Sequence, residues 1–131
     1  MTRDRKAEVE LIESLFEDWI AAVRSGDPEQ VAALYAPDAV LVPTISNRIR
    51  QTPPGITSYF DMFLLDGVDG RILEGTVRHM GDVAVHSGIY RFTISPGDSP
   101  REIDARFTFV YERLGTDWKI VAHHSSVMPE G

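Results

Sequence analysis

Apolar residues recur every three or four positions in the first part of the chain, which is the spacing of one face of an amphipathic helix. This periodic stretch runs from about Asp4 to Ser25, and Gly26 follows it where a left-handed turn commonly ends a helix. We therefore predict a first helix over these residues. Its buried stripe would consist of Val9, Ile12, Phe16, Trp19, Ile20 and Val23.

Capping signals predict two further helices on either side of a short apolar strand. Asp27 followed by Pro28 is typical of a helix start, and Pro37 requires that second helix to have ended before it. Thr52 precedes two prolines and predicts the start of the third helix. Between them, residues 39–42 form a predicted buried strand. The apolar face of the third helix would consist of Ile56, Tyr59, Phe60, Phe63 and Leu64.

Beyond residue 70 the helical period gives way to strands separated by short turns, which join antiparallel neighbours. The fold class is therefore α+β, with three N-terminal helices packed on one face of a strongly curved antiparallel sheet. Such a bent sheet predicts a pocket among the third helix, the loop at Thr44 and the last strand. The predicted strands are Arg71–His79, Val83–Ile94, Glu102–Arg113 and Trp118–Val127.

Composition and charge restrict the class of protein. The chain has 131 residues, and 13 Lys and Arg against 20 Asp and Glu give a net charge of -7, which repels nucleic acid and anionic membranes. The absence of cysteine excludes disulfides, thiolate nucleophiles and cysteine-ligated zinc. No apolar run approaches the roughly 18 residues of a membrane span, and the first residues lack the apolar core of a signal peptide. We expect one domain over residues 1–131, located in the cytoplasm, with no nucleic-acid or membrane partner.

The segment with the most candidate chemistry is the last predicted strand, which contains two histidines followed by two serines. Strict alternation from Trp118 places His124 and Ser126 on the pocket side, and His123 and Ser125 on the opposite face. A histidine with an ordinary pKa acts as a general base or acid near neutral pH, and a serine hydroxyl donates to a substrate oxygen. The alternative is that both histidines only satisfy buried polar contacts.

A metal site is not predicted. Adjacent residues on a strand point in opposite directions, so the two neighbouring histidines do not readily chelate one ion. His79 and His86 would have to complete a three-ligand set, and their spacing does not indicate one. We expect no metal and no other cofactor.

Four further positions carry polar groups that fit a ligand site. Thr44 follows the buried strand, and Asn47 lies in the same loop, where such side chains also stabilise turns. Tyr59 lies on the apolar face of the third helix, as core packing or as a ligand contact. Arg106 is either a solvated residue or an arginine that binds an anion or a second subunit.

The order of elements and several segments together resemble the nuclear transport factor 2-like (SnoaL-like) superfamily. Within it, they resemble a group related to the association domain of calcium/calmodulin-dependent protein kinase II, which includes the iota-class carbonic anhydrases, some of which work without metal. The resemblance covers nearly the whole chain. The segments that carry it are Leu41–Asn47, Tyr59–Phe60, Ser87–Thr93, Ala105–Tyr111 and His123–Glu130.

The resemblance implies a cone-shaped fold, a dimer formed through the sheet, and a pocket that handles carbon dioxide and bicarbonate. It implies that the threonine of the Pro-Thr segment, a tyrosine and a serine of the His-Ser run line this pocket; the matching positions here are Thr44, Tyr59, and Ser125 or Ser126. One difference is that Ala122 stands where the iota enzymes usually have the first of three histidines.

We thus expect a protein that resembles the iota-class carbonic anhydrases and hydrates carbon dioxide without metal. The alternatives are a non-catalytic dimerisation or ligand-binding module, and a SnoaL-like cyclase, isomerase or dehydratase, which usually requires a carboxylate base. The expected partners are a second copy of the chain and a small molecule or anion such as bicarbonate. The candidate catalytic residues are Thr44, Tyr59, His124 and Ser126, and the candidate binding residues are Ser125, Asn47, Arg106 and His123.

Overall fold

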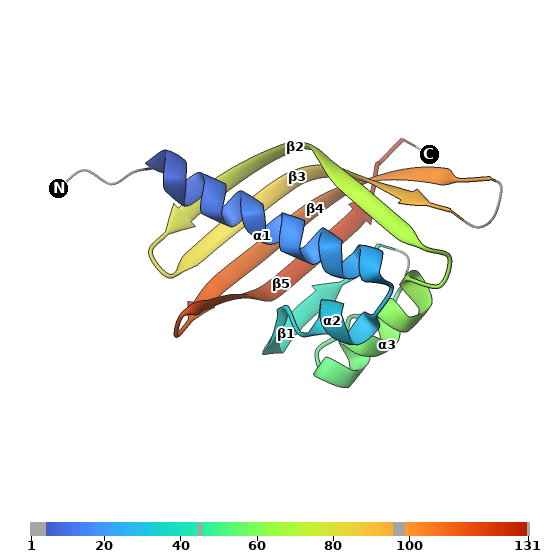
Figure 1. Cartoon of the computed structure of the whole chain (residues 1–131), viewed down its shortest axis with the longest axis horizontal. Helices are drawn as coiled ribbons and strands as arrows, with labels where there is room; N and C mark the ends of the chain where they lie inside the picture. Colours follow the sequence, from blue (N-terminus) through green and yellow to red (C-terminus); the bar gives the residue numbers. More distant parts are fainter. Residues whose placement is uncertain (1–4, 45, 96–98, 131) are drawn as a thin grey trace.

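The computed structural model describes residues 5–44, 46–95 and 99–130, and within them three helices accompany five strands (Figure 1). The first residue of the predicted first helix, Asp4, and the turn at 96–98 lie outside this described part. The elements follow one another as α1 (Arg5–Ser25), α2 (Pro28–Ala32), β1 (Tyr35–Val42), α3 (Pro53–Phe63), β2 (Val68–Met80), β3 (Val83–Ile94), β4 (Arg101–Leu114) and β5 (Asp117–Val127).

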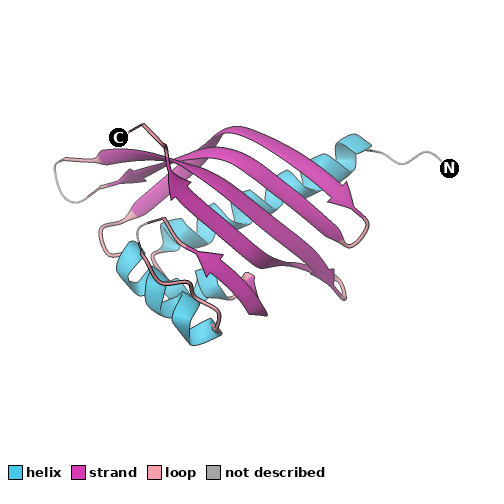
Figure 2. Ribbon diagram, turned by 180° about the vertical axis from the view of Figure 1, so that it is seen from behind, coloured by secondary structure: helices cyan, strands magenta, loops and turns pink. Residues whose placement is uncertain are grey.

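The strands form one sheet in the order β1-β5-β4-β3-β2. The four later strands are antiparallel to their neighbours, whereas β1 joins the edge parallel to β5. Figures 1 and 2 show that α1 runs across one face of the curved sheet, and that no helix of the described chain covers the opposite face. The predicted α+β class with helices on one face is therefore confirmed, and the parallel edge strand is an addition to it.

The helix boundaries follow the predicted capping signals. Gly26 has φ 75°, the left-handed conformation that ends α1, and the Asp27 side chain accepts a hydrogen bond from the backbone N–H of Glu29 at the start of α2. Thr52 caps α3 by accepting from the backbone N–H of Gly55. The buried residues of α1 include the predicted stripe from Ile12 to Val23, so amphipathic periodicity located this helix correctly.

The segment after α2 differs from the prediction. The helix ends at Ala32, and β1 begins at Tyr35 rather than at residue 39. Tyr35 pairs with Ile120 of β5, whose backbone N–H donates to the carbonyl of Leu34 at 3.0 Å. Pairing with a distant strand therefore overrides the local helical pattern here.

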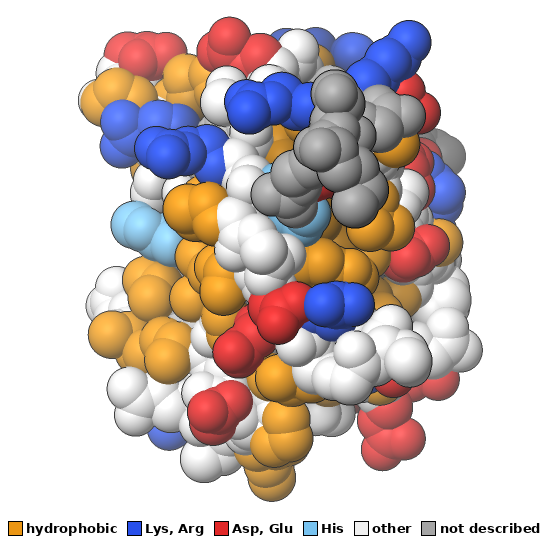
Figure 3. All heavy atoms as spheres, turned by 90° about the vertical axis from the view of Figure 1, so that its left-hand side faces the viewer, with side chains coloured by type: hydrophobic (Ala, Val, Ile, Leu, Met, Phe, Trp, Pro, Cys, Tyr) orange, Lys and Arg blue, Asp and Glu red, His pale blue; other side chains and the backbone are white. Residues whose placement is uncertain are grey.

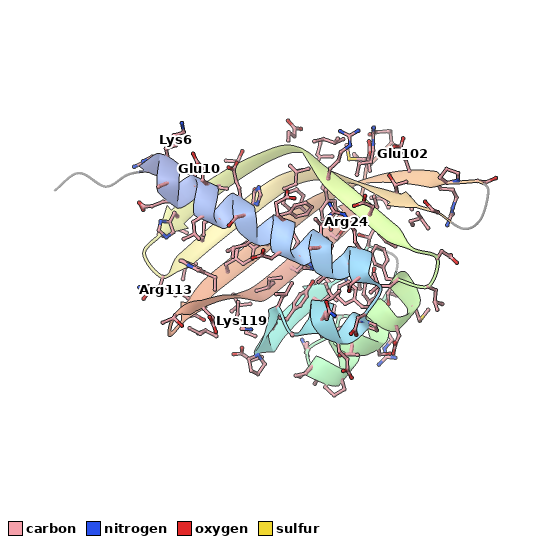
Figure 4. The ribbon with its side chains drawn as sticks, viewed as in Figure 1. Lys6, Glu10, Arg24, Glu102, Arg113 and Lys119 are labelled. Atoms are coloured by element: carbon pink, nitrogen blue, oxygen red, sulfur yellow. The ribbon has the colours of Figure 1, made fainter. Side chains whose placement is uncertain are left out.

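Charged side chains connect neighbouring elements at their ends, among them Arg24 and Lys119, which are labelled in Figure 4. Arg24 on the last turn of α1 forms an ion pair with Asp69 at the start of β2, with a distance of 2.6 Å between Nε and Oδ1. Lys119 of β5 donates to the carbonyl oxygen of Ala33 at 2.9 Å, next to the end of α2. Because these contacts are exposed, we attribute most of the stability to the buried apolar stripe rather than to them.

The surface at the end of the molecule where α1 begins carries both signs of charge and exposed hydrophobic side chains (Figure 3). In the view of Figure 3, most Lys and Arg side chains lie in the upper half, whereas Asp and Glu lie both among them and in the lower half beside hydrophobic side chains. None of the helices in the described ranges is long and apolar enough to cross a membrane.

Candidate functional site

A small cavity lies between the inner face of the sheet and the helices, in the position predicted from the third helix, the loop at Thr44 and the last strand. About 10 Å³ of it is open to the centre of a water molecule, which is room for roughly one water. Its walls are mostly aromatic and aliphatic, with a few hydroxyl groups and one imidazole. The lining residues are Trp19, Leu41, Pro43, Thr44, Tyr59, Phe60, Phe63, Tyr90, Phe92, His123 and Ser125.

The side chains of β5 reach this cavity because of a β-bulge in the strand. Tyr111 of β4 pairs with Ile120, and the next residue of β4 towards the N-terminus, Val110, pairs with Ala122, so Val121 is one extra residue in β5. Such a residue reverses the inward and outward alternation beyond it. A prediction that continues the alternation from Trp118 and Ile120 therefore assigns every later residue to the wrong face.

The predicted placement of His124 and Ser126 in the pocket is accordingly wrong, and so is the placement of His123 and Ser125 on the outer face. His123 and Ser125 are 3% and 5% exposed and line the cavity. His124 is exposed on the other face of the sheet, opposite Thr108, and Ser126 lies half-buried beside it. The pocket thus contains one histidine and one serine of the doubled pair, but not those that simple alternation selects.

Three hydroxyl groups converge on the wall of the cavity. Thr44 follows the end of β1, and its Oγ1 forms a hydrogen bond with Ser125 Oγ. The Tyr90 hydroxyl from β3 donates to the same Ser125 oxygen at 2.6 Å. The loop after β1 and the strands β3 and β5 each contribute to this cluster, so it exists only in the assembled sheet.

His123 is held from all sides within the core. Its Nδ1 lies 2.8 Å from the Tyr35 hydroxyl and its Nε2 lies 3.2 Å from the Tyr90 hydroxyl. Its ring stacks on Phe109, with 4.0 Å between the ring centroids. Burial, reinforced by the charge of His124, lowers the pKa of His123 to about 3. The imidazole is therefore neutral at neutral pH, and both of its nitrogens are already in hydrogen bonds, so it has no free site to act as a general base.

The two tyrosines of this network are also kept neutral. Burial raises the pKa of Tyr35 and of Tyr90 well above the ordinary value of 10.0. The Tyr35 hydroxyl also accepts a hydrogen bond from Trp19 Nε1 at 3.2 Å. The network is therefore a set of neutral donors and acceptors, with no ion among its members at pH 7.

The loop that carries Thr44 is closed by a short bridge to the chain before α3. Leu41 and Arg50 exchange two backbone hydrogen bonds, of 2.8 and 2.9 Å. The Arg50 guanidinium donates to the carbonyl of Gly55 and lies over the Tyr59 ring, 5.7 Å from its centroid. Arg50 thereby connects the loop to the helix that supplies Tyr59, and it places a cation behind one wall of the cavity.

The remaining predicted binding residues do not reach this cavity. Asn47 is exposed in the loop and is not among the residues that line it. Arg106 is exposed on the outer face of the sheet, where it borders a shallow hollow with Thr108, His124 and Ser126. The prediction that Arg106 is a solvated residue of the polar face agrees with this position. Its other predicted roles, with an anion or a second subunit, remain predictions.

The described residues contain no group of three or more His, Asp or Glu side chains arranged to hold a metal ion. His79 pairs with Glu8 at 2.8 Å, and His86 is buried against Phe107, so neither approaches His123 in these contacts. The polar groups of the cavity are hydroxyls and an imidazole that is hydrogen-bonded at both nitrogens.

Sequence reasoning missed three residues of the network, namely Trp19, Tyr35 and Tyr90. The sequence pattern places Trp19 only in the buried stripe of α1, and Tyr35 lies ahead of the predicted strand at residues 39–42, although it belongs to β1. Tyr90 lies within a segment that carries the family resemblance, but its pattern did not indicate a site. A usable signal was the polar tip on each of these large side chains, since buried Trp and Tyr usually find hydrogen-bond partners.

The fold and the pocket on the inner face of the sheet define a protein of the nuclear transport factor 2-like class. Residues 6–129 match the family described as calcium/calmodulin dependent protein kinase II association domain, and the chain belongs to that family. A comparison with curated proteins gave no match.

Solved structures agree with this assignment. A candidate association domain of this kind from Xanthomonas campestris is 45% identical, with a TM-score of 0.89 over 92% of this chain and 87% of that one. A nuclear transport factor 2-like protein of unknown function from Pseudomonas putida KT2440 is 26% identical, with a TM-score of 0.79 over 92% and 87%. A candidate scytalone dehydratase from Novosphingobium aromaticivorans, at 13% identity and a TM-score of 0.84 over 98% and 89%, shares the fold.

Proposed function

We propose that the cavity binds carbon dioxide and bicarbonate and that the protein hydrates carbon dioxide without a metal ion. The observation that carries this proposal is the contact between the Thr44 and Ser125 hydroxyls at a cavity with room for about one water molecule. Tyr59 lines the same cavity, so the three positions implied by the family resemblance meet in one place.

The chemistry of the cavity walls suits both molecules that must meet there, and holding the two together requires the cavity to widen beyond its present room for about one water molecule. Carbon dioxide is small and apolar, and the rings of Trp19, Phe60, Phe63 and Phe92 form an apolar surface for it. Water and bicarbonate need hydrogen-bond partners, which the hydroxyl groups supply. The adjacent Arg50 guanidinium, stacked over Tyr59, favours the negative charge of bicarbonate.

In the proposed reaction the oxygen of a held water adds to the carbon of carbon dioxide, one proton leaves to solvent, and bicarbonate forms. The hydroxyls of Thr44 and Ser125 orient the water, and the one hydroxyl hydrogen that is not used between them donates to the oxygen on which negative charge develops. His123 positions Tyr90 and does not remove the proton, because both of its nitrogens are in hydrogen bonds. Without a metal to lower the pKa of water, the expected rate is modest.

The alternative of a SnoaL-like dehydratase or cyclase is supported less well. Such chemistry usually needs a carboxylate base, and none of the described residues that line the cavity is Asp or Glu. A binding module without catalysis uses the same cavity and the same hydroxyls. This alternative predicts the same affinity for bicarbonate as the proposal but no hydration of carbon dioxide.

Stopped-flow measurement of carbon dioxide hydration, with and without a chelator, tests the proposal. Bicarbonate binding is measured in parallel through the fluorescence of Trp19, which lines the cavity. Ser125→Ala should reduce both signals at least about tenfold, because one of few donors is lost. Ser126→Ala is the matched control: it removes the same atom from the next residue, on the opposite face, and should leave both unchanged.

Three outcomes separate the alternatives. Hydration that survives the chelator and falls only in Ser125→Ala supports the proposal. Bicarbonate binding without any hydration supports the binding module and contradicts catalysis. Equal effects of the two serine variants, or no binding at all, contradict the assignment of this cavity as the site.

A further inference from the structure

A continuous chain of hydrogen bonds runs through the core to the cavity, and we infer that it has one fixed direction. In that direction it presents a hydroxyl hydrogen to the cavity, so the site selects ligands that accept a hydrogen bond. The inference depends on the proposed function only for the identity of the ligand as bicarbonate. The members of this hydrogen-bond chain are, in order, Trp19, Tyr35, His123, Tyr90, Ser125 and Thr44.

The direction is set at the buried end of the chain. The indole N–H of Trp19 is a donor only, so in its 3.2 Å contact the Tyr35 oxygen must accept. The remaining partner of the Tyr35 hydroxyl in these hydrogen bonds is His123 Nδ1, at 2.8 Å. If Nδ1 carried the proton, the Tyr35 oxygen would accept twice, and its own hydrogen would have no acceptor in the described contacts. A buried hydroxyl hydrogen without an acceptor is disfavoured, so Tyr35 donates to Nδ1.

This assignment fixes the tautomer of His123. The ring is neutral, because it is 3% exposed and its partners are hydroxyl groups rather than carboxylates. With Nδ1 accepting from Tyr35, the ring proton must lie on Nε2, which then donates to the Tyr90 oxygen across 3.2 Å. The Tyr90 hydroxyl in turn donates to Ser125 at 2.6 Å.

Counting hydrogens at the cavity end gives the polarity of the site. Ser125 and Thr44 have two hydroxyl hydrogens, and one of them is used in the bond between the two residues. Because Tyr90 already donates to Ser125, the other hydrogen remains for the cavity. In the reverse direction Ser125 would donate to Tyr90 and Thr44 to Ser125, and only lone pairs would face the cavity. The two tautomers of His123 therefore correspond to opposite ligand preferences.

Under this inference Trp19 and Tyr35 are positioning residues: they act on the ligand only through His123 and the hydroxyls beyond it. The matching ligand is a small molecule with an oxygen lone pair, such as a planar oxyanion. Bicarbonate would bind through an unprotonated oxygen rather than through its O–H group. A small ammonium ion, which can only donate, gains no bond from this hydrogen and should bind more weakly than an acceptor of similar size.

The test is a long-range ¹H–¹⁵N correlation spectrum of the histidine rings in the folded protein at pH 7, which distinguishes the two tautomers directly. We expect His123 to be in the Nε2–H form with at least about a tenfold excess. Observation of the Nδ1–H form overturns the inference, whatever ligand binds. An Nε2–H form without bicarbonate binding leaves the inference in place and contradicts the proposed function instead.

A pair of matched variants tests where the direction is set. Tyr90→Phe should keep the Nε2–H tautomer, because Tyr35 still donates to Nδ1, while binding at the cavity weakens. Tyr35→Phe removes that donor and should bring both tautomers to detectable amounts. A change of tautomer in Tyr90→Phe and not in Tyr35→Phe contradicts the assigned direction.

Ligand preference gives an independent readout in the unmodified protein. Sodium formate and methylammonium chloride are titrated separately, and the amide signals of Thr44 and Ser125 are followed. Formate should shift these signals in a saturable way, and methylammonium should not. The opposite preference contradicts the inferred polarity.

Discussion

Lowering the pH from 7 to 5 should reduce the free energy of unfolding by about 2 kcal/mol through His123 alone. The pKa of this residue falls from the ordinary 6.5 to about 3 in the folded protein because the ring is buried. Between these two values the unfolded chain binds a proton that the folded chain does not, so stability decreases as the pH falls through this window. Each pKa unit corresponds to about 1.4 kcal/mol, and pH 5 lies about 1.5 units below 6.5.

The assay is urea denaturation at pH 7 and pH 5 for the wild type, His123→Gln and His124→Gln. The carboxyl groups with lowered pKa, Asp69 and Asp104, ordinarily titrate near 3.8, so pH 5 largely avoids their contribution. His124→Gln should keep the full loss, because this neighbour is exposed on the other face. His123→Gln should keep only a smaller loss, since burial also lowers the pKa of His86.

The comparison uses the change with pH within each variant, so a lower overall stability of His123→Gln does not affect it. The pKa of the wild-type ring by NMR gives a second measurement that needs no variant. A ring that titrates near pH 6 in the folded protein would refute the reasoning. So would equal pH dependence in the wild type and His123→Gln.

Three further predictions concern assembly, metal content and strand packing. The uncovered face of the sheet carries Val110 among polar residues, and we predict a homodimer of about 29 kDa, twice the 14.6 kDa chain; light scattering at micromolar concentration that gives a monomer contradicts this. Purified protein should contain no stoichiometric zinc, calcium or iron, and elemental analysis that finds about one ion per chain refutes it. Gly88→Ala should destabilise the fold by at least about 2 kcal/mol, because the new Cβ would lie 2.0 Å from the carbonyl oxygen of Glu74. Ser87→Ala, the control in denaturant titrations, should change stability by less than about 0.5 kcal/mol, and similar losses in both contradict this reason.

The parts of the fold that local patterns determine were predictable from the sequence. The apolar stripe of α1 and the caps at Asp27 and Thr52 each depend on residues that are close together in the sequence, so the sequence pattern predicts them. The parallel pairing of β1 with β5 is not predictable in this way. It joins Tyr35 to Ile120, and the conformational preferences of neighbouring residues do not predict a contact between such distant positions.

The sequence predicted the location of the candidate site but not which residues of β5 face the cavity. The Thr44 loop, α3 and the last strand were each recognised, and they do enclose the cavity. Which histidine points inward depends on the bulge at Val121, where the pairing register between β4 and β5 shifts by one residue. The sequence around Val121 contains no glycine or proline that would indicate a bulge. A prediction from the sequence therefore extends the regular alternation through this position.

The bulge at Val121 has a consequence for how this strand tolerates insertions and deletions. In a His-His-Ser-Ser run, a shift by one residue replaces an inward histidine and serine with another histidine and serine. Deletion of Val121 removes only the extra residue and leaves the pairing of His123 and Ser125 with β4 unchanged, so the same pair should still face the cavity. A variant that lacks Val121 should therefore retain ligand binding, with Ser125 still essential and Ser126 still dispensable. A slip of β5 by one residue would instead turn His124 and Ser126 inward, a chemically equivalent pair, whereas in most strands such a slip exchanges apolar for polar residues. The His-His-Ser-Ser run thus preserves the types of side chain in the pocket if the register of β5 shifts by one residue.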